Sequence, residues 1–300
     1  MRYLMILALL SILLCSSSAF CQMNSTSSEE LNASALRSLV ADASSQSQLY
    51  RFLMEMEQNT DLVNLTTGEV QALYTRTISA GSINMSARSL KIVMASLTVP
   101  KGDEVNATAF GLDEYLINDS LYLKMDGSWT YMKLPEVAEA WSQQNTMKQQ
   151  IDMLNQSNLT MLGSEVVGDD DCYILFAKVN SSAIAEQISK QTGPSLPVQF
   201  MNLSELLRNT TMNAYYWIAK DAHQLKKAKV TESFTFNPAY LGLPTNETEN
   251  IEMRVNTTIS MLFEDINESV NIILPEEAGT AKLFSQDLIA TNVTQAATKA

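Results

Sequence analysis

Histidine and cysteine, which many catalytic and metal sites need, are rare in the chain, with one His and three Cys. Its single histidine, His223, follows Asp221 in a predicted hairpin turn, and a turn is a poor place for the buried base of a Ser-His-Asp or Cys-His site. The acidic run from Gly168 to Asp171 could offer carboxylates to a hard cation, but its position between two predicted strands is more typical of a polar turn. We expect no catalytic residue, no metal site and no cofactor.

A covalent modification is indicated instead by the triplet Asn-X-Ser/Thr, the acceptor for N-glycosylation. The triplet occurs 15 times, whereas 21 Asn and 55 Ser or Thr in 300 residues would give roughly four by chance. The alternative is that these polar residues merely co-occur on a surface. The excess predicts an N-glycosylated protein whose used sites face solvent. The acceptors are Asn24, Asn32, Asn64, Asn84, Asn106, Asn118, Asn155, Asn158, Asn180, Asn202, Asn209, Asn246, Asn256, Asn267 and Asn292.

The first residues, MRYLMILALLSILLCSSSAFCQ, contain one basic residue, an apolar run and then small residues, which is the pattern of a secretory signal. Cleavage after Ala19 or after Cys21 would suit the small-residue rule. Cys21 is also a candidate for lipid attachment, although Phe20 stands where that signal needs a small residue, and an uncleaved anchor is a further alternative. We expect a signal peptide over 1–21 and an exported protein that is extracellular or held at the cell surface, with anchoring to the membrane through its N-terminus as an alternative.

Composition limits the partners and the compartment. The net charge of −13 argues against nucleic acid and against electrostatic binding to anionic lipid. Charged residues make up 18% of the chain, too few for a charge-saturated disordered protein. Outside the signal Cys172 stands alone, so no internal disulfide is expected, and the chain is long enough to form a full core without one.

The order of predicted elements indicates one α+β domain of about ten strands. A Ser/Thr-rich spacer over 22–28 precedes a helix over 29–45, and LYRFLMEMEQ then alternates with period two as a strand does. The other predicted helices cover 135–157 and, in short pieces, 181–209. The other predicted strands lie near 70–79, 82–87, 89–99, 105–110, 114–134, 159–180, 212–237 and 249–266. We expect a single domain over 29–285 and a polar C-terminal tail over 286–300.

The stretch EYLINDSLYLKMDGSWTYMKL, from Glu114 to Leu134, contains two tight-turn signals between apolar runs and predicts three antiparallel strands. Pairing across the turns sets Lys124 opposite Trp129 and Tyr122 opposite both Tyr115 and Tyr131. The aliphatic residues point to the other side. Two apolar faces suggest that both are at least partly covered, either by two layers of one core or by a core on one side and a ligand cavity on the other. We expect the aliphatic face to meet the helices, and the aromatic face, with Lys124 and Lys133 extending past its rings, to form the outer, partly exposed surface.

Methionine is frequent in the predicted strands, and its flexible thioether adapts to irregular apolar partners such as lipid tails. The alternative is that these methionines are ordinary core residues. If they line a cavity, the sequence predicts these ligand-lining residues: Phe52, Met54, Met56, Leu116, Leu121, Leu123, Met125, Met132, Met253 and Met261.

Laid out in this way, the chain resembles the periplasmic lipoprotein-localisation carriers and the related mycobacterial lipid-carrier lipoproteins, particularly their archaeal surface relatives. Four segments carry the resemblance: YRFLMEME; EYLINDSLYLKMDGSWTYMKL; GDDDCYILFAKV; and YYWIAKDAHQLKKAKV with FEDINESVNIILPEEA after it. The resemblance implies a strongly curved, unclosed antiparallel half-barrel whose concave face is plugged by the helices at 29–45, 135–157 and 181–209. It also implies an apolar cavity for acyl chains between sheet and helices.

These observations predict an exported, N-glycosylated, non-catalytic carrier or binding protein for a lipid or other long apolar ligand. The alternative is a structural or adhesive cell-envelope glycoprotein whose core is filled by its own side chains.

Overall fold

The computed structural model describes residues 33–134, 141, 145–179, 210–237 and 250–283. The helices are α2 (Ala33–Ser45) and α4 (Thr146–Gln156), with short 3-10 turns η1 (Glu104–Asn106) and η4 (Glu276–Thr280). The strands are β1 (Leu49–Asn64), β2 (Val70–Asn84), β3 (Ser89–Pro100), β4 (Thr108–Ile117), β5 (Ser120–Met125), β6 (Ser128–Lys133), β7 (Asn158–Val167), β8 (Asp170–Lys178), β9 (Thr211–Ala219), β10 (Leu225–Phe236), β11 (Ile251–Glu264) and β12 (Lys282–Leu283).

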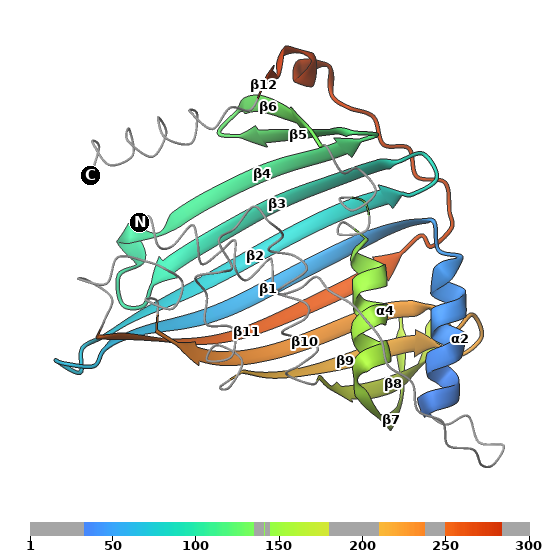
Figure 1. Cartoon of the computed structure of the whole chain (residues 1–300), viewed down its shortest axis with the longest axis horizontal. Coiled ribbons are helices and arrows are strands. Elements are labelled where there is room, and N and C mark those ends of the chain that lie inside the picture. Colours follow the sequence, from blue (N-terminus) through green and yellow to red (C-terminus); the bar gives the residue numbers. More distant parts are fainter. Residues whose placement is uncertain (1–32, 135–140, 142–144, 180–209, 238–249, 284–300) are drawn as a thin grey trace.

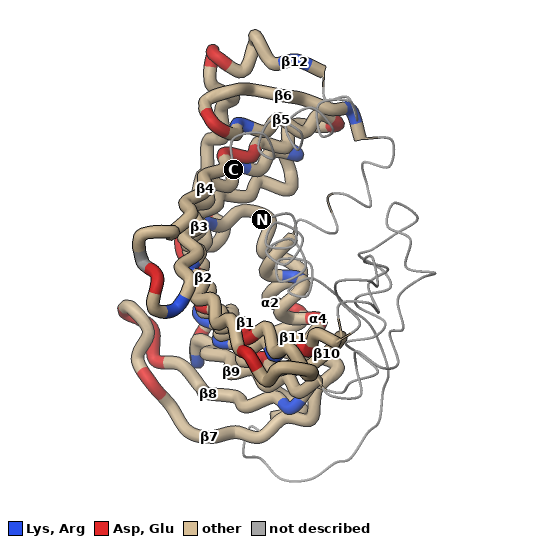
Figure 2. Tube along the Cα trace, turned by 90° about the vertical axis from the view of Figure 1, so that its left-hand side faces the viewer, with Lys and Arg blue, Asp and Glu red and all other residues tan. Residues whose placement is uncertain are grey.

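All twelve strands belong to one sheet, in the order β12-β6-β5-β4-β3-β2-β1-β11-β10-β9-β8-β7 (Figure 1). Neighbours pair antiparallel, except that β12 pairs parallel with β6. The long strand β1 is central because β11 returns from the far end of the sequence to pair with it over fourteen positions, from Arg51 to Asn64. Figure 2 shows the sheet strongly curved and open, with α2 and α4 on the inside of the curve. We call the side that meets these helices the concave face and the other side the convex face.

Alternation along the strands explains why the sheet has one buried side. In β10, buried residues recur at every second position from Ala228 to Phe236, and Ser233 and Lys229 between them are exposed. This period of two places one set of side chains on the concave face and the other on the convex face. The pattern continues across the pairing partners, since Val230 lies opposite Ile259 and Ile259 lies opposite Met56.

The two helices are fixed to the sheet and to each other by polar contacts. The Tyr50 hydroxyl donates to Asn145 Oδ1 at 3.0 Å and accepts the Met147 backbone N–H at 3.1 Å. Asn145 is also the N-cap of α4, because its side chain accepts the backbone N–H of Lys148. Arg37 of α2 donates to the Ser157 carbonyl just after α4 at 2.6 Å. The first turn of α4 is therefore oriented by a buried strand residue.

Several element predictions need correction. The described residues form twelve strands where about ten were expected, and the predicted strands 70–79 and 82–87 are parts of one strand, β2. Residues 105–110 are not a separate strand, because Thr108 begins β4, which continues to Ile117. The helices expected over 181–209, the start of that over 135–157, the signal, the spacer and the whole predicted tail lie outside the described residues.

The hairpin faces were predicted correctly in pairing and only in part in exposure. Lys124 lies opposite Trp129 and Tyr122 opposite Tyr131, as expected. Tyr122 and Tyr131 are partly exposed, whereas Tyr115 and Trp129 are 5% and 7% exposed and so are buried. Both rings pack with Ala278 of η4 in a second, small core. The residues after β11 cover this face on their way to β12, which is a long-range contact that no local pattern encodes.

Candidate ligand-binding face

The helix-covered end of the concave face is filled by side chains of this chain. Leu36 and Val40 of α2, Leu154 of α4 and Tyr50 of β1 are fully buried in one main core cluster. Phe52 closes the space over Gly81, because a Cβ at that glycine would lie 2.2 Å from the ring. Ring contacts continue the packing, with the centroids of Tyr50 and Phe263 5.9 Å apart.

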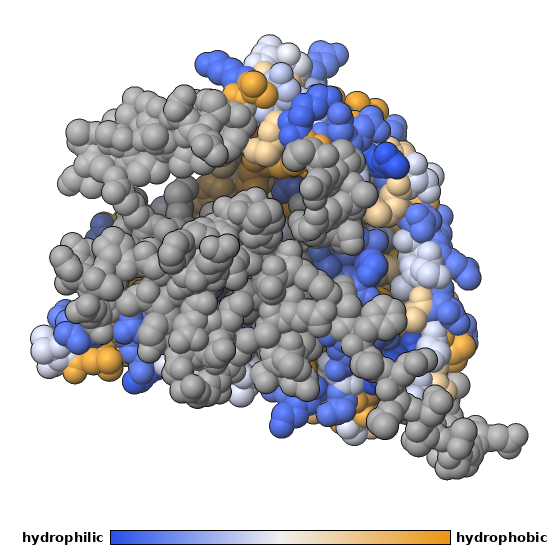
Figure 3. All heavy atoms as spheres, viewed as in Figure 1, coloured by the Kyte–Doolittle hydropathy of each residue, from blue (hydrophilic) through white to orange (hydrophobic). Residues whose placement is uncertain are grey.

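The other end of the same face differs in its packing. Five leucine and methionine residues from β3 to β6 point to the concave side, are half-buried and lie outside the main cluster among the described residues. Cross-strand pairing joins them, as Met94 lies opposite Leu112 and Leu112 opposite Met125. Figure 3 shows hydrophobic residues at the floor of a recess just below the β5–β6 hairpin. We call this group the apolar wing: Met94, Leu112, Leu123, Met125 and Met132.

The structure places all ten sequence-predicted lining residues on the concave face. Seven of them pack in or against the main core: Phe52, Met54, Met56, Leu116, Leu121, Met253 and Met261. The remaining three, Leu123, Met125 and Met132, belong to the apolar wing. The predicted set is thus brought to one face but divided between a filled end and a half-buried end, and its role in contacting a ligand stays a proposal.

Two glutamates on the concave face were missed by the sequence analysis. Glu232 of β10 is 5% exposed, and Glu114 of β4 lies in the row between Ile92 and Leu123. Burial raises the pKa of each carboxyl to about 7, because a charged carboxylate loses its hydration there. The sequence could have indicated Glu232, because it occupies a position where the alternation of its strand predicts an apolar residue, between Val230 and Phe234.

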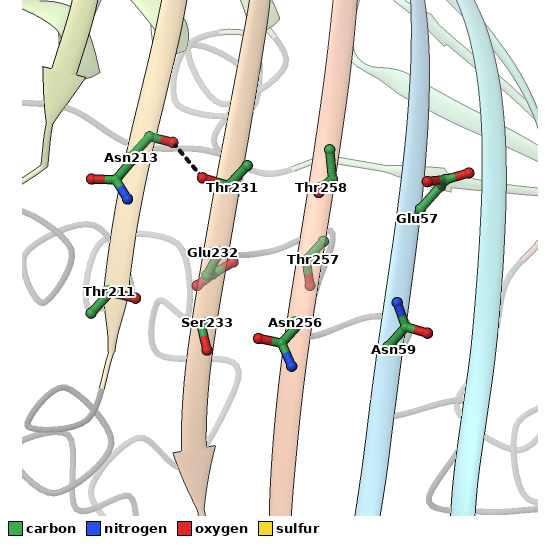
Figure 4. A pocket seen from close by; sticks show the side chains of 10 residues that line it. All are labelled: Glu57, Asn59, Thr211, Asn213, Thr231, Glu232, Ser233, Asn256, Thr257 and Thr258. Carbon is green, nitrogen blue, oxygen red and sulfur yellow. Dashed lines mark hydrogen bonds between the residues drawn. The ribbon is translucent and has the colours of Figure 1, made fainter.

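A groove of about 360 Å³ lies over β9, β10, β11 and β1 (Figure 4). Eight of the residues that line it form two cross-strand rows on the convex face, and Glu232 and Thr257 between these rows alternate to the concave side. Glu57 is the one charged side chain of the two rows. The rows are Glu57, Thr258, Thr231 and Asn213, and then Asn59, Asn256, Ser233 and Thr211. The groove is polar and includes the glycosylation acceptor Asn256, so it is not a site for an apolar molecule.

The groups considered for catalysis or metal binding are placed apart or already paired. His223 has a φ of 54° in the β9–β10 turn, as expected for a turn residue. In the acidic turn, Asp170 pairs with Lys226 and Asp171 with Lys220, each at 2.8 Å. Within the described ranges, no group of three His, Cys, Asp or Glu residues is arranged to hold a metal ion.

Eight of the glycosylation acceptors fall within the described residues, and none of these eight is buried. Asn64, Asn84 and Asn155 are partly exposed. The exposed acceptors are Asn106, Asn118, Asn158, Asn256 and Asn267. The other seven lie outside the described ranges.

A curved, open antiparallel sheet with helices on its concave side defines the class of fold, and its apolar concave face defines the candidate site. The chain belongs to the family of unknown function DUF6612, which it matches over residues 40–282. No curated protein matches it. In the part of the chain that the structure describes, no helix has the length and apolar character needed to cross a membrane.

Solved structures that are similar include lipoproteins of the kinds that the sequence resembles. Lipoprotein LppX of Mycobacterium tuberculosis is 13% identical with a TM-score of 0.37, covering 80% of this chain and 98% of that one. LprF of Mycobacterium bovis is 12% identical with a TM-score of 0.38, covering 81% and 98%. A LolA superfamily protein of Nitrosomonas europaea is 10% identical with a TM-score of 0.23, covering 86% and 100%. At these TM-scores the likeness is loose and carries no argument about ligand or partner.

Proposed function

We propose that the protein is a non-catalytic carrier or binding protein for a lipid or other long apolar molecule held between the curved sheet and the helices. The observation that carries this proposal is the apolar wing, whose leucine and methionine side chains face the concave side without joining the main core. Burial of alkyl surface is worth about 0.8 kcal/mol per methylene. A chain of about ten carbons would thus provide enough free energy for stable capture.

The proposal includes export and N-glycosylation. It is supported by the signal-like first residues and by the surface position of every acceptor among the described residues. Intact-mass measurement of the protein recovered from its native host would test both, because it gives the cleavage point, any diacyl group on Cys21 and the glycan load together. A mass equal to that of the unprocessed, unmodified chain would contradict this part of the proposal.

A structural or adhesive envelope glycoprotein is the second candidate. It is favoured by the helix-covered end, where Phe52 over Gly81 shows that the chain can fill its own concave face. In that case the wing would also be closed by the protein itself and no guest would be recovered.

Organic extraction or native mass spectrometry of the purified protein distinguishes the two. The carrier proposal expects a co-purifying lipid and saturable binding of an apolar fluorescent dye. Leu123→Asp, which places a charge in the apolar wing, should abolish dye binding. Val93→Asp is the matched control, because Val93 is 40% exposed on the convex side of β3, two strands from Leu123 in the sheet, and it should leave binding unchanged. Repeated extraction without lipid, together with no saturable dye site, would rule out the carrier proposal.

A further inference from the structure

Polar side chains cross the middle of the concave face between two apolar regions. The register of pairing aligns Glu232, Thr257, Gln58, Thr75 and Thr98 in one row across β10, β11, β1, β2 and β3. Neighbouring positions of the same face add four more polar residues. We call this set the polar belt: Glu232, Thr257, Gln58, Thr60, Thr75, Thr77, Ser79, Ser96 and Thr98.

At the β1–β3 end of the belt, most polar groups satisfy one another. Gln58 Nε2 donates to Thr60 Oγ1 at 2.9 Å. The Thr75 and Thr98 hydroxyls are 3.0 Å apart, and those of Thr77 and Ser96 are 2.9 Å apart. Ser79 Oγ is the exception at this end, because it is buried without a hydrogen-bond partner among the described residues.

At the β10–β11 end, the side chains are equally buried but unsatisfied. Glu232 is 5% and Thr257 is 4% exposed, and these two residues lie directly opposite each other. Neither Glu232 Oε1 nor Thr257 Oγ1 has a hydrogen-bond partner among the described residues. A buried polar atom without a partner costs about 1–3 kcal/mol, so the pair needs a specific explanation.

The surroundings of this pair are apolar along both strands. Val230 and Ile259 flank it on the helix side, and Phe234 and Val255 flank it on the other side. From the belt to Phe52 and Phe263 is six residues along β1, or about 20 Å of strand. These flanking residues are buried in the main core, so the pair is a polar point inside an apolar region. A polar head group on an apolar chain would match that pattern.

We propose that the Glu232–Thr257 pair binds the polar end of the ligand, and that this end is a hydrogen-bond donor such as a hydroxyl or an amine, not a carboxylate or a phosphate. This inference rests on the proposed function, since it assigns the head group of the same guest. A carboxyl oxygen and a hydroxyl accept bonds from a donor head. An anionic head would meet a carboxylate, and two buried like charges repel strongly.

The test is competition for a bound apolar dye, near pH 8, by three molecules with the same alkyl chain: hexadecanol, hexadecylamine and palmitate. In the wild-type protein, the alcohol and the amine should displace the dye at concentrations about tenfold or more below that for palmitate, as one charge-assisted hydrogen bond predicts. In Glu232→Gln the difference should shrink to about threefold or less, because the amide is uncharged. Thr257→Val, which removes the hydroxyl at similar volume, should weaken alcohol binding.

Glu114→Gln is the matched control, because it removes one buried carboxyl from the same face and changes the net charge equally. It should leave the ligand preference unchanged. If the dye binds but the three competitors are equivalent, or if Glu232→Gln leaves their difference intact, the head-group assignment is wrong. If Glu114→Gln alone changes the preference, the head lies on the wing and the assignment is also wrong. If wild-type protein binds no dye, the proposed function itself fails.

Discussion

The helix-covered end and the apolar wing are two parts of one face of one sheet, built from the same residue types, yet they differ in packing. Leu90 of β3 is fully buried in the main core, whereas Leu123 of β5 is half-buried and outside it. The first region is filled because α2 and α4 insert side chains over it. The comparison teaches that an apolar sheet face is not in itself a binding site. It becomes a candidate where no other described segment of the chain packs over it.

The largest predicted effect is a difference in stability between alanine substitutions at these two leucines. Leu90→Ala leaves a cavity in a packed core and should lower the free energy of unfolding by about 2–5 kcal/mol. Leu123→Ala removes a half-buried side chain and should cost about 1 kcal/mol, while weakening dye binding. Chemical denaturation of both variants measures the contrast. Equal losses of unfolding free energy at the two positions would mean that the wing is packed as tightly as the core. The two regions would then not differ as described.

The second prediction concerns the buried Glu232 carboxyl. Its pKa is about 7 in the folded protein against an ordinary 4.5. Between these values the unfolded chain has lost this proton while the folded chain keeps it, so stability falls as pH rises and levels off above about pH 7. The fall should be about 3 kcal/mol, and its cross-strand neighbours Met212 and Thr257 carry no charge that would offset it.

Urea unfolding at about pH 5 and pH 8, for wild type and Glu232→Gln, isolates this contribution. The variant should lose less stability over the interval and should exceed the wild type at the higher pH. If the unfolding free energy of both proteins changed equally with pH, the Glu232 carboxyl would not be buried as described. Glu114→Gln gives the corresponding value beside the wing, where the same pKa of about 7 predicts a similar difference.

The third prediction tests how tightly the helix-covered end is filled. Gly81→Ala would set a Cβ 2.2 Å from the Phe52 ring, and overpacking of this kind costs about 1–3 kcal/mol. Adding Phe52→Leu should recover part of the loss, because the ring is the obstacle. A double-mutant cycle measures this coupling. If the stability changes of the two substitutions were additive, the Phe52 ring would move aside without cost. The helix-covered end would then be packed as loosely as the wing.

Much of the sheet could be predicted because alternation is a local property. The turns near Asn118 and Asp126, both with positive φ, fixed the pairing of β4, β5 and β6 from sequence alone. The concave side of Leu123 and Met125 followed from that register. Strand ends were predicted less well, as β2 shows, since the buried residues Gly81 and Ile83 continue the alternation past Ser79.

The rest depends on contacts between distant segments. Nothing local indicates that Ala278 packs on Tyr115 and Trp129, because the two segments are separated by nearly the whole second half of the chain. Glu232 could have been found, since a carboxylate in the apolar phase of a strand is unusual. The lack of a hydrogen-bond partner for its carboxyl oxygen could not have been predicted, because it depends on Thr257 of β11, which lies opposite Glu232 in the sheet.

The smallest expected effect concerns the hydroxyl that joins the two layers. Tyr50→Phe keeps the ring contacts with Phe263 but removes the bonds to Asn145 and to the Met147 backbone, which should cost about 1 kcal/mol. Tyr122→Phe on the convex side, where the ring stacks on Tyr131, is the control and should change stability by less than about 0.5 kcal/mol. Thermal unfolding of the two variants compares them. Because Tyr50 orients α4 and makes no contact with the wing, dye binding should be retained in Tyr50→Phe. Its loss would show that the helix position controls both ends of the face.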